Sequence, residues 1–485
     1  MAQQKPKDVY GTATVTTVGS TTTVATTNGP RGHSAFDWPS FQVPVGTTVD
    51  FVQPSVQSLS INRVVTGGGS SVINGLLKSN GRLVLVNPAG IAFGAGAQVD
   101  TASFTASTLG MTAADMILGR LRFDLANNGD DEKDKDKDKD KDKDKNKGSA
   151  GTLRVDSTSV LAKNGDVVLI GPNIEIGRGA VVEAVGGDVI LAAGRRVELT
   201  GRGLEGIRME VRAPDDKAVN LGTLKGDSVA IFAGQLQHSG LIQAKTVTTS
   251  GGKVILQGLK EAEIEGRIEA ANALRGGSVL ITAEKLELKK ATFIDVRHGA
   301  GGGEILIGGG RRGADPRLLN AAEVKVEQGV QLKADATLAG LGGTVVLWSE
   351  RKTEFAGQIT ARGAGAPGGY VEVNSRRELK FKKEGKVDVS SAPAGSSSQS
   401  GASGGSSETR QQPRRPGKSF PEGTVIALIP TSQQPVEVQE AIAAPDRETA
   451  GKLNEMAWMP TLASKPEDPY DRKVVVTAVQ CTVTR

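Results

Sequence analysis

Short apolar runs recur along most of the chain, and each is entered through a glycine. The shared phrase is Gly or Asn-Gly, one variable residue, and then a short run dominated by Val, Leu or Ile. Several neighbouring phrases lie about 22 to 26 residues apart, and the longer gaps are near multiples of this spacing or carry insertions. Such a spacing is typical of a stacked repeat. The phrases occupy residues 80–85, 164–169, 186–191, 251–256, 276–281, 302–307, 342–347 and 368–373.

A repeat of this size is one thin turn of chain that cannot bury its own apolar face. Successive turns must therefore stack, with parallel strands about 4.8 Å apart. Glycine suits the corners because bends there need a positive φ or a close backbone approach. The sequence thus predicts an all-β protein, a right-handed parallel β-helix with a capped N-terminal end and a largely disordered C-terminal tail. An antiparallel sandwich or a β-propeller remains open, although propeller blades repeat at about 40 residues with Trp-Asp marks that are missing here.

Composition also favours many short strands joined by tight turns, since 485 residues include 63 Gly and only 4% aromatics. The threonine-rich stretch 12–27 alternates like exposed strands and is expected to cap the first coil. No run approaches the roughly 20 apolar residues of a transmembrane helix, and no apolar signal segment follows residues 1–7. The chain is therefore expected either to stay in the cytoplasm or to have lost an export signal already.

Charge is nearly balanced, because 59 basic and 54 acidic residues give a net charge of +5. This balance does not indicate a nucleic-acid binder. Two basic clusters are interpreted as solvated surface, with contact to anionic sugars, lipopolysaccharide or nucleic acid as the alternative. The single cysteine, Cys481, excludes an intrachain disulfide and a Cys-rich zinc site. The clusters comprise Arg376, Arg377, Lys380, Lys382, Lys383 and Lys386, and Arg410, Arg414, Arg415 and Lys418.

Two segments break the repeat. Residues 130–148 alternate opposite charges without an apolar residue, so they cannot offset their ordering entropy and are expected to form a disordered loop. From residue 390 the chain is rich in Ser, Gly and Pro, which predicts a flexible linker to about residue 423. The remainder, 424–485, is expected to be poorly ordered, with one strand at 473–483.

Four motifs near the N-terminus go beyond the repeat: AFDWPSF at 35–41, VDFVQPS at 49–55, INRV at 61–64 and NPAGI at 87–91. Their order closely resembles the N-terminal haemagglutination-activity domain, also called the two-partner secretion domain, of the filamentous haemagglutinin family. The resemblance is specific over residues 12–125, and later segments resemble the repeat region of such exoproteins. Together with the two breaks in composition, it predicts a secretion domain at 1–125, a charged loop at 126–148, a β-helix repeat region at 149–389, a linker at 390–423 and a tail at 424–485.

The resemblance also implies a function. Family members pass through the periplasm, a dedicated outer-membrane transporter recognises the N-terminal domain, and adhesion at the cell surface is the usual activity. We therefore expect a secreted, adhesin-like exoprotein outside the cell or on the bacterial surface. Its expected partners are the transporter and host glycans or other anionic surfaces, without specific nucleic acid and without a cofactor. The motifs give five candidates for transporter recognition: Asn62, Arg63, Asn87, Pro88 and Gly90.

The same residues have a structural interpretation. Pro88 fixes φ at about −65° and removes a backbone donor, Asn87 can bond its own turn, and Gly90 supplies a freer backbone. A buried Asn62 can form a ladder with its neighbours, and Arg63 on a coil edge can be solvated. Corner geometry and transporter contact therefore both remain open. The family's asparagine after Asn-Pro is Ala89 in this chain, a departure at the centre of the motif.

A carbohydrate-active β-helix enzyme is the rival class. It would need acidic residues gathered on one exposed face across adjacent coils. Asp215 and Asp216 follow a proline and are interpreted as turn residues, while His33, His238 and His298 are scattered. No catalytic triad or histidine metal site is therefore predicted, and we expect a protein that is not an enzyme. A short secretion-domain scaffold without adhesive activity is the remaining alternative.

Overall fold

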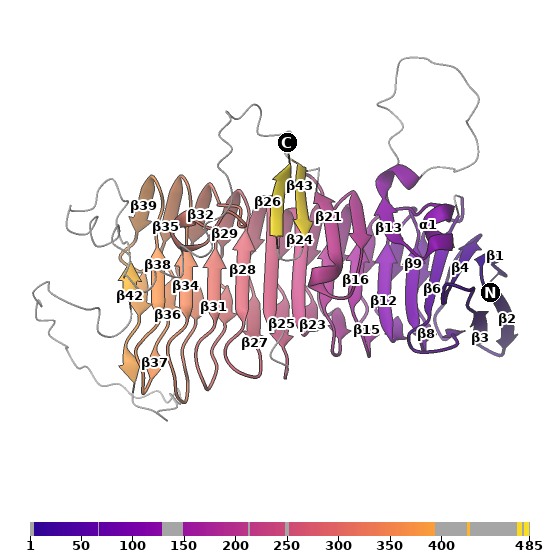
Figure 1. The fold of residues 1–485 in the computed structure, drawn as a ribbon, viewed down its shortest axis with the longest axis horizontal. Coiled ribbons are helices and arrows are strands. Elements are labelled where there is room, and N and C mark those ends of the chain that lie inside the picture. Colours follow the sequence, from indigo (N-terminus) through magenta and orange to yellow (C-terminus); the bar gives the residue numbers. More distant parts are fainter. Residues whose placement is uncertain are drawn as a thin grey trace, which may run out of the picture.

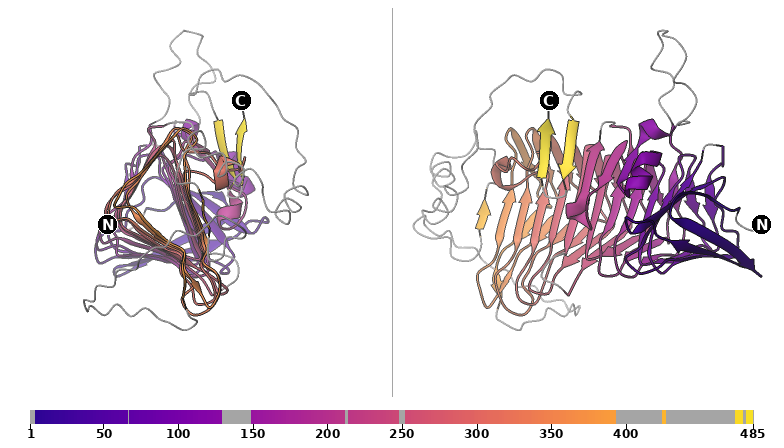
Figure 2. Two further views of the ribbon diagram at one scale, coloured as in Figure 1. Left: turned by 90° about the vertical axis from the view of Figure 1, so that its left-hand side faces the viewer. Right: turned by 45° about the vertical axis from the view of Figure 1, so that its right-hand side comes forward.

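The computed structural model describes residues 4–65, 67–128, 149–211, 214–247 and 252–392, and three short strands at 424–426, 473–477 and 480–484. These residues form a right-handed parallel β-helix, as predicted, whose coils stack along one long axis (Figure 1). Viewed along that axis, the faces of the coils enclose one core (Figure 2). The expected charged loop beyond residue 128, the linker beyond residue 392 and the tail outside the three strands lie outside the described residues.

Each coil supplies strands to three faces, and the long strands β24 and β26 continue from the first face into the second. The first face contains β1 (Lys7–Tyr10), β4 (His33–Trp38), β6 (Leu59–Val64), β9 (Arg82–Val86), β12 (Ser103–Ser107), β16 (Val167–Ile170), β19 (Val189–Ala192), β24 (Ser228–His238), β26 (Lys253–Ile264), β28 (Ser278–Thr282), β31 (Glu304–Ile307), β34 (Thr344–Leu347), β38 (Tyr370–Val373) and β42 (Thr424–Ile426). The second face adds β7 (Ser71–Ile73), β10 (Ile91–Phe93), β14 (Leu153–Val155), β17 (Asn173–Ile176), β22 (Lys217–Asn220), β29 (Lys285–Leu288), β32 (Glu323–Val326), β35 (Lys352–Phe355) and β39 (Glu378–Phe381).

The third face is a separate sheet on the remaining side of the coil. It contains β2 (Thr12–Val18), β3 (Thr21–Thr27), β5 (Thr48–Val52), β8 (Leu76–Ser79), β11 (Gln98–Thr101), β15 (Ser159–Ala162), β18 (Val181–Ala184), β23 (Thr223–Gly226), β25 (Leu241–Lys245), β27 (Arg267–Ala271), β30 (Phe293–Asp295), β33 (Gln331–Lys333), β36 (Gln358–Thr360) and β40 (Lys386–Asp388). Two short strands, β37 (Gly363–Ala364) and β41 (Ser391–Ala392), follow β36 and β40 in the sequence and pair with each other in parallel.

The repeated glycine phrases place their first apolar side chains in a single interior column, which Phe104 and Val229 continue in coils without the phrase. Parallel register aligns Val167 with Val189, and Val189 with Val229, and all three are buried. Because parallel strands align residue by residue, each member packs on the same position of the coils before and after it. The column comprises Leu83, Phe104, Val167, Val189, Val229, Val254, Val279, Ile305, Val345 and Val371.

A second layer, which the sequence analysis did not predict, covers part of the outside of the first face. Its apolar core includes outward side chains such as Val168 and Ile190, so β16 and β19 are buried on both sides. Burial on both sides explains why these strands are continuous apolar runs without alternation. The layer consists of α1 (Ala113–Leu118), the antiparallel strands β13 (Leu121–Asp124), β20 (Arg196–Leu199), β21 (Ile207–Val211), β43 (Lys473–Thr477) and β44 (Gln480–Thr484), and the 3₁₀ turns η1 (Leu125–Asn127) and η2 (Leu204–Gly206). A third 3₁₀ turn, η3 (Arg311–Gly313), lies farther along the chain.

The N-terminal end of the β-helix is closed by an antiparallel hairpin. Strands β2 and β3 pair from Thr12 and Thr27 to Val18 and Thr21, and β3 then pairs in parallel with β5. This hairpin is the cap expected from the threonine-rich stretch. The single strand expected at 473–483 is instead the hairpin β43–β44, which pairs with β21 and extends the outer layer.

Candidate functional site

The register between β6 and β9 brings the five candidate residues to one corner of adjacent coils. Arg63 pairs with Val86, the last residue of β9, so Asn87 follows directly beyond that pair. The turn at 87–90 then leads from the first face to β10 on the second face. The motifs that are separate in the sequence therefore form one local structure, the 62–90 corner.

Asn62 lies in the interior and its amide is fully engaged there. Its Oδ1 accepts a hydrogen bond from Trp38 Nε1 at 2.9 Å, and its Nδ2 donates to Ser60 Oγ at 3.1 Å. Asn62 is only 1% exposed. Because an unpaired indole N–H would be costly to bury, the geometry assigns Asn62 a structural role.

Arg63 points outward and ties the coil to the outer layer. Its guanidinium makes a bidentate pair with Asp37, at 2.8 and 3.0 Å, and donates to the carbonyl of Met111 at 2.7 Å. Both side chains of the ion pair are mostly shielded, with 15% of Arg63 and 12% of Asp37 exposed. The planar guanidinium suits this arrangement because it can satisfy a carboxylate and a carbonyl together.

Asn87 fastens the turn from inside. Its Nδ2 donates to the Gly69 carbonyl and to Ser71 Oγ, both at 2.9 Å, while its Oδ1 accepts from the Ala89 amide at 3.0 Å. The Gly90 amide closes the turn on the Asn87 carbonyl at 3.0 Å. Gly90 has φ of 121°, a backbone conformation that a side chain would strain.

The following coil packs directly against the turn. The Gly151 amide donates to the Pro88 carbonyl at 2.8 Å, and a Cβ on Gly151 would lie 2.3 Å from the Ala89 carbonyl oxygen. Asn62, Asn87 and Gly90 are buried, Pro88 is half-buried, and Ala89 is exposed. The surface that this corner offers to another molecule is therefore centred on Pro88 and Ala89.

The sequence analysis missed the helix that Arg63 reaches through Met111. The sequence carried signals for both ends of this helix, namely Thr112 three residues before Asp115 and a glycine at 119. In the structure, Thr112 Oγ1 accepts a hydrogen bond from the Asp115 amide at 3.0 Å, and Gly119 ends the helix with φ of 67°. A Thr three residues before an Asp, followed by a glycine, is a typical pair of helix-end signals. The helix is short, so its apolar pattern alone could not have identified it.

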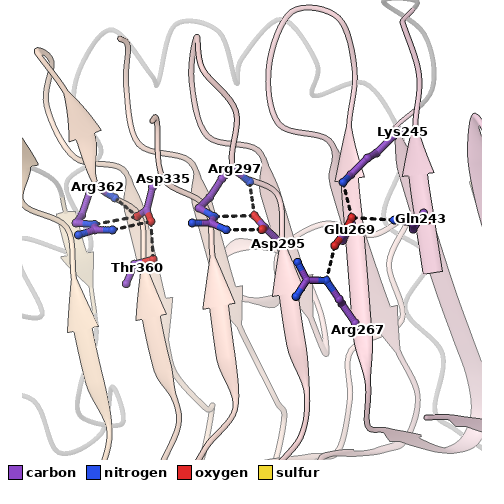
Figure 3. Close-up of polar contacts among 9 residues, drawn as sticks. All are labelled: Gln243, Lys245, Arg267, Glu269, Asp295, Arg297, Asp335, Thr360 and Arg362. Atoms are coloured by element: carbon purple, nitrogen blue, oxygen red, sulfur yellow. Dashed lines mark hydrogen bonds and ion pairs between the residues drawn. The ribbon is translucent and has the colours of Figure 1, made fainter. Parts of the chain in front are cut away.

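A second candidate surface is a ladder of ion pairs on the third face, shown in Figure 3. Glu269 accepts from Lys245, Arg267 and Gln243, the last at 3.1 Å. Burial alone would raise the pKa of Glu269, but these hydrogen bonds outweigh it and lower the pKa to about 2. Asp295 forms a bidentate ion pair with Arg297, whose Nε and Nη2 donate at 2.9 and 2.6 Å. Asp335 accepts hydrogen bonds from Thr360 and Arg362.

The acids of this ladder are shielded and the bases face solvent. Side-chain exposure is 10% for Glu269 but 49% for Arg267, and 3% for Asp335 but 35% for Arg362. Phe293 lies among them, with the Arg267 guanidinium 4.4 Å from its ring centroid. The third face therefore presents cationic groups around an aromatic ring, a surface chemistry suited to anionic partners.

The basic cluster at 376–386 is largely neutralised. Arg376 pairs with Glu350 at 3.0 Å, and Lys382 with Glu354 at 3.3 Å, while both basic side chains stay exposed to solvent. The second cluster, at 410–418, lies outside the described residues. Within the described part of the chain, no group of three His, Cys, Asp or Glu side chains is arranged to hold a metal, and no helix is long and apolar enough to cross a membrane.

Comparison with known families finds a match over residues 2–237 to the TPS secretion domain. The match extends past residue 125, where we expected the secretion domain to end, and takes in the outer-layer strands β13, β20 and β21. The crystal structure of the HMW1 secretion domain from Haemophilus influenzae covers 81% of this chain and all of that chain, with a TM-score of 0.66 and 26% sequence identity.

Two relatives are heme/hemopexin-binding proteins of Haemophilus influenzae. One, from strain Rd, is 37% identical over 100 residues, and the other is 34% identical over 105 residues. The aligned parts cover 21% and 22% of this chain but only 11% of each relative. The chain thus spans about a ninth of the length of these relatives. The binding of heme and hemopexin that their names state is said of those proteins.

Proposed function

We propose that this chain is exported by an outer-membrane transporter that recognises Pro88 and Ala89, the exposed tip of the 62–90 corner. The chain belongs to the two-partner secreted exoproteins through its TPS secretion domain. The family match over residues 2–237 carries the proposal, because a TPS domain implies such a transporter. Pro88 and Ala89 are the accessible residues of the turn, while Asn87 and Gly90 hold the turn in shape from inside. In this view the buried candidates position the tip and the tip makes the contact.

A pair of exposed alanines allows the tip to be tested without disturbing the core. Ala89 is exposed in the turn after β9, and Ala95 is exposed in the next turn of the same coil, after β10. Ala89→Lys should reduce the secreted fraction in cells that carry the partner transporter, whereas Ala95→Lys should leave it near the wild-type level. Both purified variants should keep a native circular dichroism spectrum. Equal secretion of the two folded variants would refute recognition at the tip.

We further propose that the exported rod acts as an adhesin, with the third face as its contact surface. Its cationic, aromatic-bearing ladder fits anionic glycans or other anionic surfaces. The full chain should bind erythrocytes or immobilised anionic polysaccharide, and binding should weaken with salt because the contacts are between charges. Charge reversal at Lys333, which also lies 5.1 Å from the Phe293 ring, should weaken binding more than the same change at the exposed Lys163 on an earlier coil. Absence of binding by the folded chain would favour a scaffold without adhesive activity.

A further inference from the structure

A small cavity at the edge of the first face is lined by two arginines and one acid, Asp166, whose carboxylate is hydrogen-bonded to backbone amides. It has a volume of about 40 Å³ and is lined by Arg82 and Arg202 together with polar and small groups from three coils. Arg82 begins β9, and the register places it beside Ser103, which in turn lies beside the coil corner that carries Asp166. The remaining lining residues are Val56, Gln57, Ala102, Ser103, Asn164 and Gly165.

Arg82 is half-buried, and among the described residues its guanidinium has no hydrogen-bond or ion-pair partner. This is unusual in a molecule where shielded cations such as Arg63 have a bidentate carboxylate. Burial and then the neighbouring charge of Arg202 lower the pKa of Arg82, while Asp166 acts in the opposite direction. The cavity therefore contains a partly desolvated positive charge close to a second one.

The nearby carboxylates offset part of this charge but form no ion pair with either arginine, because their oxygens accept hydrogen bonds from backbone amides instead. Asp166 accepts from the Asp188 amide at 3.0 Å through Oδ1 and from the Gly203 amide at 2.7 Å through Oδ2. Asp188 accepts from the Leu204 amide at 2.9 Å and from the Ser228 amide at 2.9 Å. Both acids are thus used to fasten the loop between β20 and η2 to the coils.

These hydrogen bonds hold the loop in a position that brings Arg202 to the cavity. Arg202 precedes Gly203, whose φ of 64° turns the loop towards the coil, and one Nη2 of Arg202 donates to the Asn164 carbonyl at 2.9 Å. The other guanidinium N–H groups of Arg202 have no partner among the described residues. Two guanidinium groups from different layers of the protein therefore converge on one small opening, with unused donors on both.

We infer that this cavity is a binding site for a single oxyanion, held between Arg82 and Arg202. Phosphate or sulfate groups match the donor set, because guanidinium forks pair with tetrahedral or planar oxyanions through parallel N–H bonds. Ser103 also lines the cavity, but it already donates its hydroxyl proton to the Asp166 carbonyl at 2.9 Å, so the anion would be held by the two arginines. Arg82 begins β9, whereas the turn at 87–90 follows the other end of that strand, so the site does not depend on the proposed transporter contact at Pro88 and Ala89.

The test measures binding of inorganic phosphate by the full chain. Isothermal titration and melting temperature should both report millimolar or tighter binding at constant ionic strength, with chloride replacing phosphate in the reference. Arg82→Gln and Arg202→Gln should each weaken phosphate binding by about tenfold or more, as expected for loss of charge-assisted hydrogen bonds. Arg202 is exposed, so its variant is expected to fold even if Arg82→Gln does not.

A matched control separates the site from general stabilisation by phosphate, which is excluded from protein surfaces and stabilises folds non-specifically. Arg178 is an exposed arginine of the same domain that does not line the cavity, and Arg178→Gln should bind phosphate like the wild type. Glycerol 3-phosphate in the same assay tells whether the group is also accepted when attached to a larger molecule. The inference is overturned if the wild type shows no phosphate binding, or if Arg202→Gln and Arg178→Gln bind it equally.

Discussion

The indole Nε1 of Trp38 donates to Oδ1 of Asn62 across 2.9 Å in the interior of the first coils. Both side chains are buried, and they come from strands that pair in parallel, β4 and β6. The first coils therefore contain a polar pair between the aromatic motif at 35–41 and the motif at 61–64. This pair gives a structural reason for both motifs that does not involve a partner protein.

Replacing Asn62 should test this pair directly. Asn62→Leu leaves the buried Trp38 N–H without an acceptor, so the free energy of unfolding should fall by about 1–3 kcal/mol. Adding Trp38→Phe removes the stranded donor, so the double variant should lose less than the sum of the two single losses. Urea denaturation followed by circular dichroism would measure all three variants. Strictly additive losses would mean that the pair contributes nothing beyond its separate packing.

The turn after β9 should depend more on Asn87 than on Pro88. Asn87→Ala removes the acceptor for one amide and the donors to the Gly69 carbonyl and Ser71, so it should cost about 1–3 kcal/mol. Pro88→Ala acts chiefly through the flexibility of the unfolded chain and should cost about 1 kcal/mol or less. Neither change should unfold the β-helix, because neighbouring coils hold the strands on both sides. Thermal melts that rank the two variants in the opposite order would contradict this account.

How far the sequence predicted the structure follows from which interactions are local. The interior column through Val167 and Val189 was predictable, because one phrase repeats at one spacing and parallel stacking aligns it. The outer layer was not predicted, although Val168 and Ile190 carried a sign of it in being apolar where an exposed strand would be polar. Periodicity cannot say what covers a doubly apolar strand.

The candidate corner shows the same limit. The motifs singled out Asn62, Arg63 and the turn at 87–90, and the strand register shows that they lie at one corner, which the sequence did not predict. The sequence could not show that Asn62 points inward to Trp38, since a strand register fixes which face a side chain occupies. The cavity at Arg82 could not be predicted for a related reason. Arg202 belongs to a loop 120 positions later in the chain, and that loop is held by hydrogen bonds from its backbone amides to Asp166 and Asp188.

Acid should destabilise the protein through His238 before it affects most carboxylates. Burial lowers the pKa of His238 to about 4, and its Nδ1 lies 3.1 Å from Asn220 Nδ2. The Gly222 amide donates to Asn220 Oδ1, which orients that NH₂ group towards the ring, so a proton on Nδ1 would face another donor. The unfolded chain binds a proton below about pH 6.5 while the folded chain does not until about pH 4.

Stability should therefore be complete above pH 6.5 and fall as the pH drops towards 4, by up to about 3 kcal/mol. Urea denaturation at a series of pH values would measure the slope. His238→Gln removes the titrating group, so its stability should change less than that of the wild type across this window, even if it starts lower. An unchanged slope in the variant would show that His238 is not the source.

A second acid window should belong to the ladder in Figure 3. The pKa of Glu269 is lowered from 4.5 to about 2, so the unfolded chain takes up its proton first, and the stabilisation is present above pH 4.5 and lost as the pH falls towards 2. Because Lys245 and Arg267 are about half exposed, solvent screens the pairs, and we expect a contribution on the order of 1–2 kcal/mol at neutral pH. Glu269→Gln should remove most of this contribution at pH 7 and flatten the pH dependence between 4.5 and 2, while Glu304→Gln, at an exposed position on the first face, should do neither. Added salt should reduce the difference between wild type and Glu269→Gln. If the two variants have equal melting temperatures at pH 7 and low salt, the ladder is only a solvated array of charges.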